Sequence, residues 1–248
     1  METEIFVAII GGIFSLFTAL IIILLPRWLE RRDQRKPQTD ENPVSQKFPN
    51  IIQFDKRHWW NQLDDNWKQV FNQAIGYEEK GLIGLINRVV RTELNDNDLD
   101  KIFNLQTLDC SNHQFGSLEP LRPLTELHIL KCGQNQLSDL EPLRPLTQLR
   151  HLDCYANKIS SLEPLCQLTQ LQKLYCGNNQ ISNLEPLRQL TQLQELYCGW
   201  NQISDLEPLR SLTHLQKLHC SENQQSQLEI DKFKEAVPNC HIQGMVKA

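Results

Sequence analysis

Leucine and cysteine recur along the second half of this 248-residue chain at a constant spacing of 22 residues. Each cysteine of the series has leucine five and two positions upstream, and asparagine follows three positions downstream in every unit but the first. Further leucines then appear at every third residue. A repeat of this kind determines the whole fold. The repeated cysteines are Cys110, Cys132, Cys154, Cys176, Cys198 and Cys220.

The spacing inside one unit predicts a short strand followed by a tight return path. Leu174 and Cys176 alternate with Tyr175, so both apolar side chains lie on one face of a strand. The asparagine that follows is placed to satisfy backbone groups where the chain turns off the strand. Leucine at every third residue fits a 3₁₀-like or extended path better than an α-helix. One proline per unit, such as Pro186, favours that path because proline fixes φ and lacks an N–H.

The frame Leu-x-x-Leu-x-Cys-x-x-Asn-x-Ile-x-x-Leu-x-Pro-Leu-x-x-Leu resembles a leucine-rich repeat of the 22-residue internalin-like type. Cysteine stands where leucine is usual on the strand. The resemblance implies an α/β repeat solenoid with a parallel sheet on its concave face, and a binding module rather than an enzyme. Ordering one 22-residue unit costs about 30 kcal/mol at about 1.5 per residue, so a single unit cannot fold alone. The units must stack and share a core.

The pattern of apolar and polar residues divides the chain into five parts. We predict a transmembrane anchor at 1–26, a basic and polar linker at 27–50, a small helical N-terminal cap at 51–98, the repeats at 99–228 and a C-terminal cap at 229–248.

Residues 5–25 contain no charged side chain, and as a helix they would span about 31 Å, which matches the hydrocarbon core of a bilayer. A cleaved signal peptide would have a basic start and a shorter apolar run, whereas this start carries Glu2 and Glu4. A buried core helix is the other alternative, although so uniform a run is rare in soluble domains. Basic residues follow directly, so we expect a retained single-pass anchor with the N-terminus outside and the repeats on the cytoplasmic side. These basic residues are Arg27, Arg31, Arg32, Arg35 and Lys36.

Apolar residues at three- and four-residue steps predict an amphipathic helix over 60–74, and Asp64 or Asp65 could cap a break within it. A second apolar segment follows at 82–90. Tryptophans here could mark a ligand site, but a cap over the apolar end of the first repeat is the favoured interpretation. The three residues are Trp59, Trp60 and Trp67.

The three-residue spacing of leucines already begins at Leu99, so we expect the repeats to start there. At the other end, the series loses its apolar residue at Gln225. An amphipathic helix over 230–237 and a final strand around Cys240 to Ile242 are expected to close the stack.

Charge and cysteine content exclude several functions. The net charge of −5 gives no support for nucleic-acid binding, which requires a basic surface. Cysteines on successive strands form a line with a spacing of about 4.8 Å, which neither converges on a tetrahedral metal nor matches the roughly 3.8 Å between the Cβ atoms of a disulfide. We expect reduced core thiols, no metal and no cofactor. No catalytic motif is present, so we expect no enzymatic activity.

Residues on the outer side of each strand vary from unit to unit, although the core residues do not, so specificity is expected on that side. Four aromatic residues would form a binding patch for another protein, kept open by the flanking glycines. The alternative is that aromatic residues simply suit strands. The core is complete without these rings, so we expect their replacement to leave folding nearly intact, and we expect the two histidines to be solvated. The predicted binding surface on the concave face comprises Tyr155, Tyr175, Tyr197, Trp200, Lys131, Lys173, His151 and His219.

A second series pairs glutamate with arginine three residues later, as in Glu119 and Arg122, and predicts a solvated convex face. Cys166 replaces the arginine in one unit and is the thiol that we expect to be accessible.

These features predict a membrane-anchored leucine-rich-repeat module that binds another protein. Two alternatives stay open: a regulatory subunit that controls an enzyme through the same face, and an extracytoplasmic adhesion module.

The topology is testable by a reporter fused after Ala248. Because the basic flank follows residues 5–25, a reporter that works only in the cytoplasm should be active. Activity of an export-dependent reporter alone would place the repeats outside and favour adhesion.

Overall fold

The computed structural model describes residues 54–76 and 92–243. These residues belong to one compact unit, Phe54–Ala248. The predicted anchor at 5–25, the linker at 27–50 and the apolar segment at 82–90 lie outside the described residues. Within the described ranges, no helix is long and apolar enough to cross a membrane.

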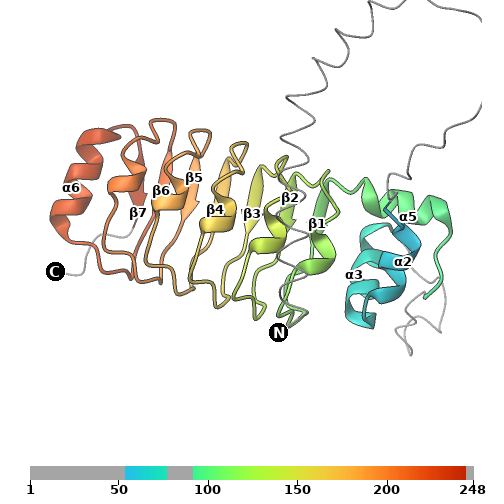
Figure 1. Ribbon diagram of the computed structural model, residues 1–248. Helices are drawn as coiled ribbons and strands as arrows, with labels where there is room; N and C mark the ends of the chain where they lie inside the picture. The colour runs from blue at the N-terminus through green and yellow to red at the C-terminus, as the bar shows by residue number, and fades with distance from the viewer. Residues whose placement is uncertain (1–53, 77–91, 244–248) are drawn as a thin grey trace, which may run out of the picture. The chain divides into compact units, whose positions relative to one another are not determined.

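Seven parallel strands stack in chain order and form one sheet (Figure 1). Each strand has three residues, and the middle one is leucine in the first six strands. Neighbouring strands from β1 to β6 pair 22 residues apart, so that Leu152 faces Leu174 and Leu174 faces Leu196. The predicted parallel sheet is therefore confirmed. The strands are β1 (Thr107–Asp109), β2 (Ile129–Lys131), β3 (His151–Asp153), β4 (Lys173–Tyr175), β5 (Glu195–Tyr197), β6 (Lys217–His219) and β7 (His241–Gln243).

The return leg of each of the first five repeats contains one turn of 3₁₀-helix with the sequence Glu-Pro-Leu. Proline is its second residue, where the missing N–H would have no partner within the helix. The leucines at three-residue spacing around this turn are buried, as Leu184, Leu187 and Leu190 show. The predicted 3₁₀-like path is confirmed. The turns are η1 (Glu119–Leu121), η2 (Glu141–Leu143), η3 (Glu163–Leu165), η4 (Glu185–Leu187) and η5 (Glu207–Leu209).

One asparagine per repeat ties each turn to the repeat before it. The Asn179 amide donates to the carbonyl oxygens of Cys154 and Cys176, both at 3.1 Å. Its side-chain oxygen accepts from the backbone N–H of Ile159 at 3.0 Å. The side chain therefore satisfies backbone groups of two repeats at once. Equivalent bonds are made by Asn135, Asn157, Asn201 and Asn223.

Helices α2 (Lys56–Gln62), α3 (Asp65–Ala74) and α5 (Asp96–Phe103) lie at the β1 end of the stack (Figure 1). Asp64 accepts from the N–H of Trp67 at 2.9 Å, so the expected break in the first amphipathic segment falls just before α3. The ring of Trp67 stacks on Phe115 with centroids 4.0 Å apart. The tryptophan side chains therefore complete the core at this end.

Both ends replace the 3₁₀-turn with an α-helix. Leu99 keeps the repeat register, 22 residues before Leu121, but lies in α5 instead of a 3₁₀-turn. The segment lacks the proline of the other units, and Asn95 caps its helix by accepting from Asp98 N–H. At the other end, α6 (Gln227–Ala236) starts three residues before the predicted helix because Ser226 caps it. The longer helix shifts the pairing of β7 to 24 residues, with Leu218 facing Ile242.

Replacing Asn179 with Ala removes the side chain that bridges two repeats. We expect a loss of at least about 2 kcal/mol in the free energy of unfolding, because buried carbonyl and N–H groups lose their partner. Chemical denaturation of the full chain measures this loss.

Asn178→Ala is the matched control. Asn178 is exposed, its side chain forms no hydrogen bond with the described residues, and Ala156 occupies the same slot one repeat earlier. The control should lose less than about 1 kcal/mol. Equal losses for both variants would show that the bridge does not hold the repeats together.

Candidate functional site

The first and third residues of each strand point away from the core and form what we call the open face of the sheet. The middle residue is buried in the first six strands, and these two outer positions are half-buried or exposed. Strand register therefore aligns them in two rows. The first row contains Thr107, Ile129, His151, Lys173, Glu195, Lys217 and His241, and the third contains Asp109, Lys131, Asp153, Tyr175, Tyr197, His219 and Gln243.

Five rings form a continuous contact series on this face, which we call the aromatic row. Tyr175 and Tyr197 meet edge to face, with centroids 4.7 Å apart. His151 contacts Tyr175 at 4.9 Å, and His219 contacts Tyr197 at 5.8 Å. Trp200 adds to the end of the row, 5.8 Å from His219. The row thus brings together five of the eight residues of the predicted binding surface.

The expectation that both histidines are solvated is wrong. His151 and His219 are half-buried because their rings pack against the tyrosines. The buried Nε2 atom of His151 has no hydrogen-bond partner among the described residues. Burial lowers the pKa of His151; nearby Asp153 raises it, and Lys173 lowers it further. A neutral His151 at pH 7 follows.

Glu195 forms ion pairs with two lysine side chains of the open face. It pairs with Lys173 at 3.0 Å and with Lys217 at 3.6 Å, and it accepts from the Tyr175 hydroxyl at 3.1 Å. Burial and this bond to Glu195 raise the pKa of Tyr175 to about 12. Burial opposes ionisation of Glu195, but the bonds from Lys173 and Tyr175 outweigh it and keep the pKa of Glu195 below its ordinary value. Lys173, predicted as a binding residue, is thus already engaged within the protein.

Gly199 leaves room for a ring, and Gly177 leaves room for the backbone of the next repeat, since a Cβ atom on Gly177 would lie 3.1 Å from the carbonyl oxygen of Gly199. A Cβ atom on Gly177 would lie 3.4 Å from the Tyr155 ring. One on Gly199 would lie only 2.9 Å from the His219 ring, a separation that real Cβ atoms essentially never show. Glycine at position 199 therefore makes room for the His219 ring, whereas a Cβ atom on Gly177 would lie at ordinary contact distance from the Tyr155 ring.

Trp200 and Tyr155 are the most accessible aromatic residues of the face, 52% and 39% exposed. Trp200 also has a left-handed backbone, with φ of 54°. That conformation costs a residue with a Cβ atom roughly 1 kcal/mol. The equivalent residues of other repeats share it, so the fold requires the conformation but not the tryptophan. They are Asn112, Gln134, Ala156, Asn178 and Glu222.

A hollow of about 370 Å³ opens beside the aromatic row. The prediction from sequence missed it, because it forms where small residues of two repeats meet tyrosines of the next three. Lys131, which was predicted as a binding residue, is exposed and does not line it. The lining residues are Ser111, Asn112, Gly133, Gln134, Asp153, Tyr155, Tyr175 and Tyr197.

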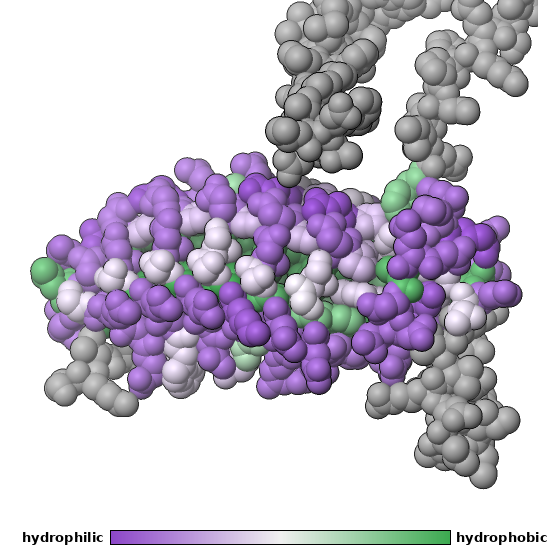
Figure 2. Space-filling view, turned by 60° about the horizontal axis from the view of Figure 1, so that its bottom comes forward, coloured by the Kyte–Doolittle hydropathy of each residue, from purple (hydrophilic) through white to green (hydrophobic). Residues whose placement is uncertain are grey.

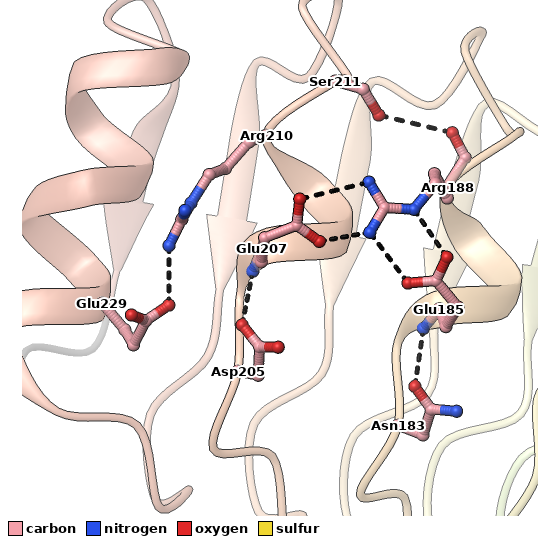
Figure 3. A network of polar contacts seen from close by, with 8 residues as sticks. All are labelled: Asn183, Glu185, Arg188, Asp205, Glu207, Arg210, Ser211 and Glu229. Atoms are coloured by element: carbon pink, nitrogen blue, oxygen red, sulfur yellow. Dashed lines mark hydrogen bonds and ion pairs between the residues drawn. The ribbon is translucent and has the colours of Figure 1, made fainter.

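The glutamate–arginine series behaves as a solvated surface. Arg188 bridges Glu185 of its own repeat, at 2.6 Å, and Glu207 of the next (Figure 3). Arg210 does not follow the expected pattern, because it pairs with Glu229 at the start of α6 at 2.8 Å. Half-exposed pairs of this kind contribute little to stability. Hydrophilic residues run along the whole length of the repeats on the face shown in Figure 2, and hydrophobic residues show between them and at the ends of the stack.

The six repeated cysteines are buried free thiols. Burial raises the pKa of Cys110 to about 12 and the pKa of Cys176 well above its ordinary value. Cys166 and Cys240 are half-buried, and burial raises the pKa of Cys240 to about 11. In the part of the chain that the structure describes, no three histidine, cysteine or carboxylate side chains are grouped as metal ligands.

Comparison with known proteins agrees with this architecture. A family model that describes two copies of a leucine-rich repeat matches three segments of the chain, residues 103–145, 147–189 and 191–233. Together these segments make up just over half of the chain. No curated protein matches.

Solved structures with the same fold include internalin InlF of Listeria monocytogenes, with 32% identity and a TM-score of 0.56. The match covers 60% of this chain but only 43% of that structure. Internalin C2 of the same organism shares 23% identity over 73% of this chain and 93% of its own, with a TM-score of 0.54. A leucine-rich-repeat protein of Leptospira interrogans shares 24% identity over 59% of this chain and 44% of its own, with a TM-score of 0.50. The last two likenesses concern the fold alone.

Thiol labelling tests the cysteine assignments. In the folded chain at pH 8, Cys166 should react first and Cys240 slowly, while the six core thiols stay unlabelled, because a buried thiol does not ionise. Mass spectrometry after timed labelling locates each adduct, and Cys166→Ala should abolish the fast phase. Fast labelling of Cys176 would contradict its place in the core.

Proposed function

The chain belongs to the leucine-rich-repeat family, and on that premise we propose that it is a binding module whose partner is another protein docked on the open face. Stacked repeats present an extended surface of the kind that repeat proteins use for binding. Residues there can change without disturbing the core, because the buried leucines lie on the other side of the sheet.

Trp200 is the observation that carries the proposal. It is half exposed and strained, and the fold accepts four other residue types at the five equivalent positions. Folding therefore gives no reason for a tryptophan there, whereas binding does, because tryptophan and tyrosine are the commonest anchors of protein interfaces. Tyr155 is a second exposed ring on the same face.

The proposal includes an anchor at 5–25 that holds the repeats at the cytoplasmic side of a membrane. Its support is the charge-free run and the basic residues that follow it. The linker at 27–50 would separate the repeats from the bilayer, leaving the open face accessible to a partner.

A double variant, Tyr155→Ala with Trp200→Ala, tests the open face. Replacement of Tyr175 and Tyr197 is less suitable than the sequence indicates, because their mutual contact is worth about 0.5–1.5 kcal/mol and Tyr175 also binds Glu195. The exposed pair should be removable with little change in the melting temperature. Loss of two anchors should weaken partner binding by about 2 kcal/mol or more, roughly 30-fold.

The measurement is quantitative capture from cells that express the protein, with the full chain as bait. Gln148→Ala with Gln170→Ala is the matched control, since both residues are exposed and lie in the turns before β3 and β4. A partner should be captured by the wild type and the control but not by the aromatic variant. Capture that is equal for all three baits would remove the open face as the binding site.

A further inference from the structure

The hollow beside the aromatic row is lined by tyrosine rings, by small or polar residues and by one carboxylate. Three of its lining residues are tyrosines, from three successive repeats, and the others are small or polar. Asp153 is its single charged lining residue, so the hollow carries one negative charge and no positive one. The faces of aromatic rings add to this, because their negative quadrupole attracts cations.

The Asp153 carboxylate accepts one hydrogen bond and forms no ion pair with the described residues. Its Oδ1 atom accepts from the backbone N–H of Tyr155 at 3.0 Å. No described lysine or arginine forms an ion pair with this carboxylate: Lys173 and Lys217 pair with Glu195 instead. Lys131 is next to Asp153 in the strand register but lies outside the hollow and is exposed. A half-buried carboxylate between tyrosines is thus left for a cation from elsewhere.

We propose that this hollow receives an arginine or lysine side chain of the partner protein, held by the Asp153 carboxylate and the rings of Tyr155, Tyr175 and Tyr197. This proposal rests on the proposed function, since the side chain arrives with a protein on the open face. Charge complementarity selects the occupant: an acidic side chain would meet Asp153 without a compensating cation, and a neutral one would leave the carboxylate without an ionic partner.

N-acetylarginine amide is the probe, with N-acetylcitrulline amide as its neutral counterpart. The full chain is held in detergent micelles at pH 7.5, with ¹³C-labelled tyrosine rings observed by NMR. The arginine compound should shift the Tyr155, Tyr175 and Tyr197 resonances in a saturable manner, with a dissociation constant on the order of 1 mM for so small a ligand. The citrulline compound should cause no saturable shift.

Asp153→Asn removes the charge but keeps an oxygen for the Tyr155 N–H, so the melting temperature should stay unchanged. Binding of the arginine probe should weaken at least about fivefold. Asp109→Asn is the matched control, because Asp109 forms the same bond to Ser111 N–H at 3.1 Å but does not line the hollow. It should leave binding unchanged.

Equal binding of both probes, no saturable shift with the arginine probe, or equal weakening by the two aspartate variants would each overturn the cation site. None of these results would alter the capture experiment with the Tyr155 and Trp200 variant, which tests the open face itself. The two proposals can therefore fail separately.

Discussion

The asparagine bridge between repeats is the interaction on which the rest of the structure depends. A strand of three residues supplies few hydrogen bonds, and the turn that follows leaves backbone groups turned inward. Asn179 and its equivalents satisfy those groups in their own repeat and in the preceding one. Buried backbone groups without partners would be too costly for so thin a stack. The asparagines thus convert a series of turns into a continuous core.

The asparagine bridge and the buried leucines hold the inner side of the sheet together. The residues on the outer side can therefore vary without disturbing the core. The aromatic row depends on strand register, which sets Tyr175 opposite Tyr197. It depends also on Gly199, because a Cβ atom there would lie 2.9 Å from the His219 ring. Charge on this face is organised around Glu195, which pairs with Lys173 and Lys217, so that no described lysine or arginine pairs with the carboxylate of Asp153. The side chains of this face are therefore held by contacts with one another.

The periodic part of the fold could be predicted from the sequence because periodicity encodes it directly. Spacing placed Leu174 in the core and Pro186 in a 3₁₀-turn, and both positions are observed. The predictions that failed concern side chains whose positions depend on contacts between repeats. The burial of His151 comes from the ring of Tyr175, 24 residues later. Arg210 pairs with Glu229 of the next repeat, and Glu207 of its own repeat pairs with Arg188 of the preceding one. The hollow was missed for the same reason, since its walls come from five repeats.

The constant 22-residue offset between β1 and β6 makes the length of the stack adjustable in whole units. A duplicated unit would bring its own asparagine, leucines and cysteine, and would lengthen the open face by about 4.8 Å without a new core design. An insertion between a cysteine and the asparagine three residues later would separate the asparagine from the carbonyl groups that it bridges. Duplication between β4 and β5 would also part Tyr175 from Tyr197. The same regularity that makes the scaffold extensible therefore ties the aromatic row to one particular order of units.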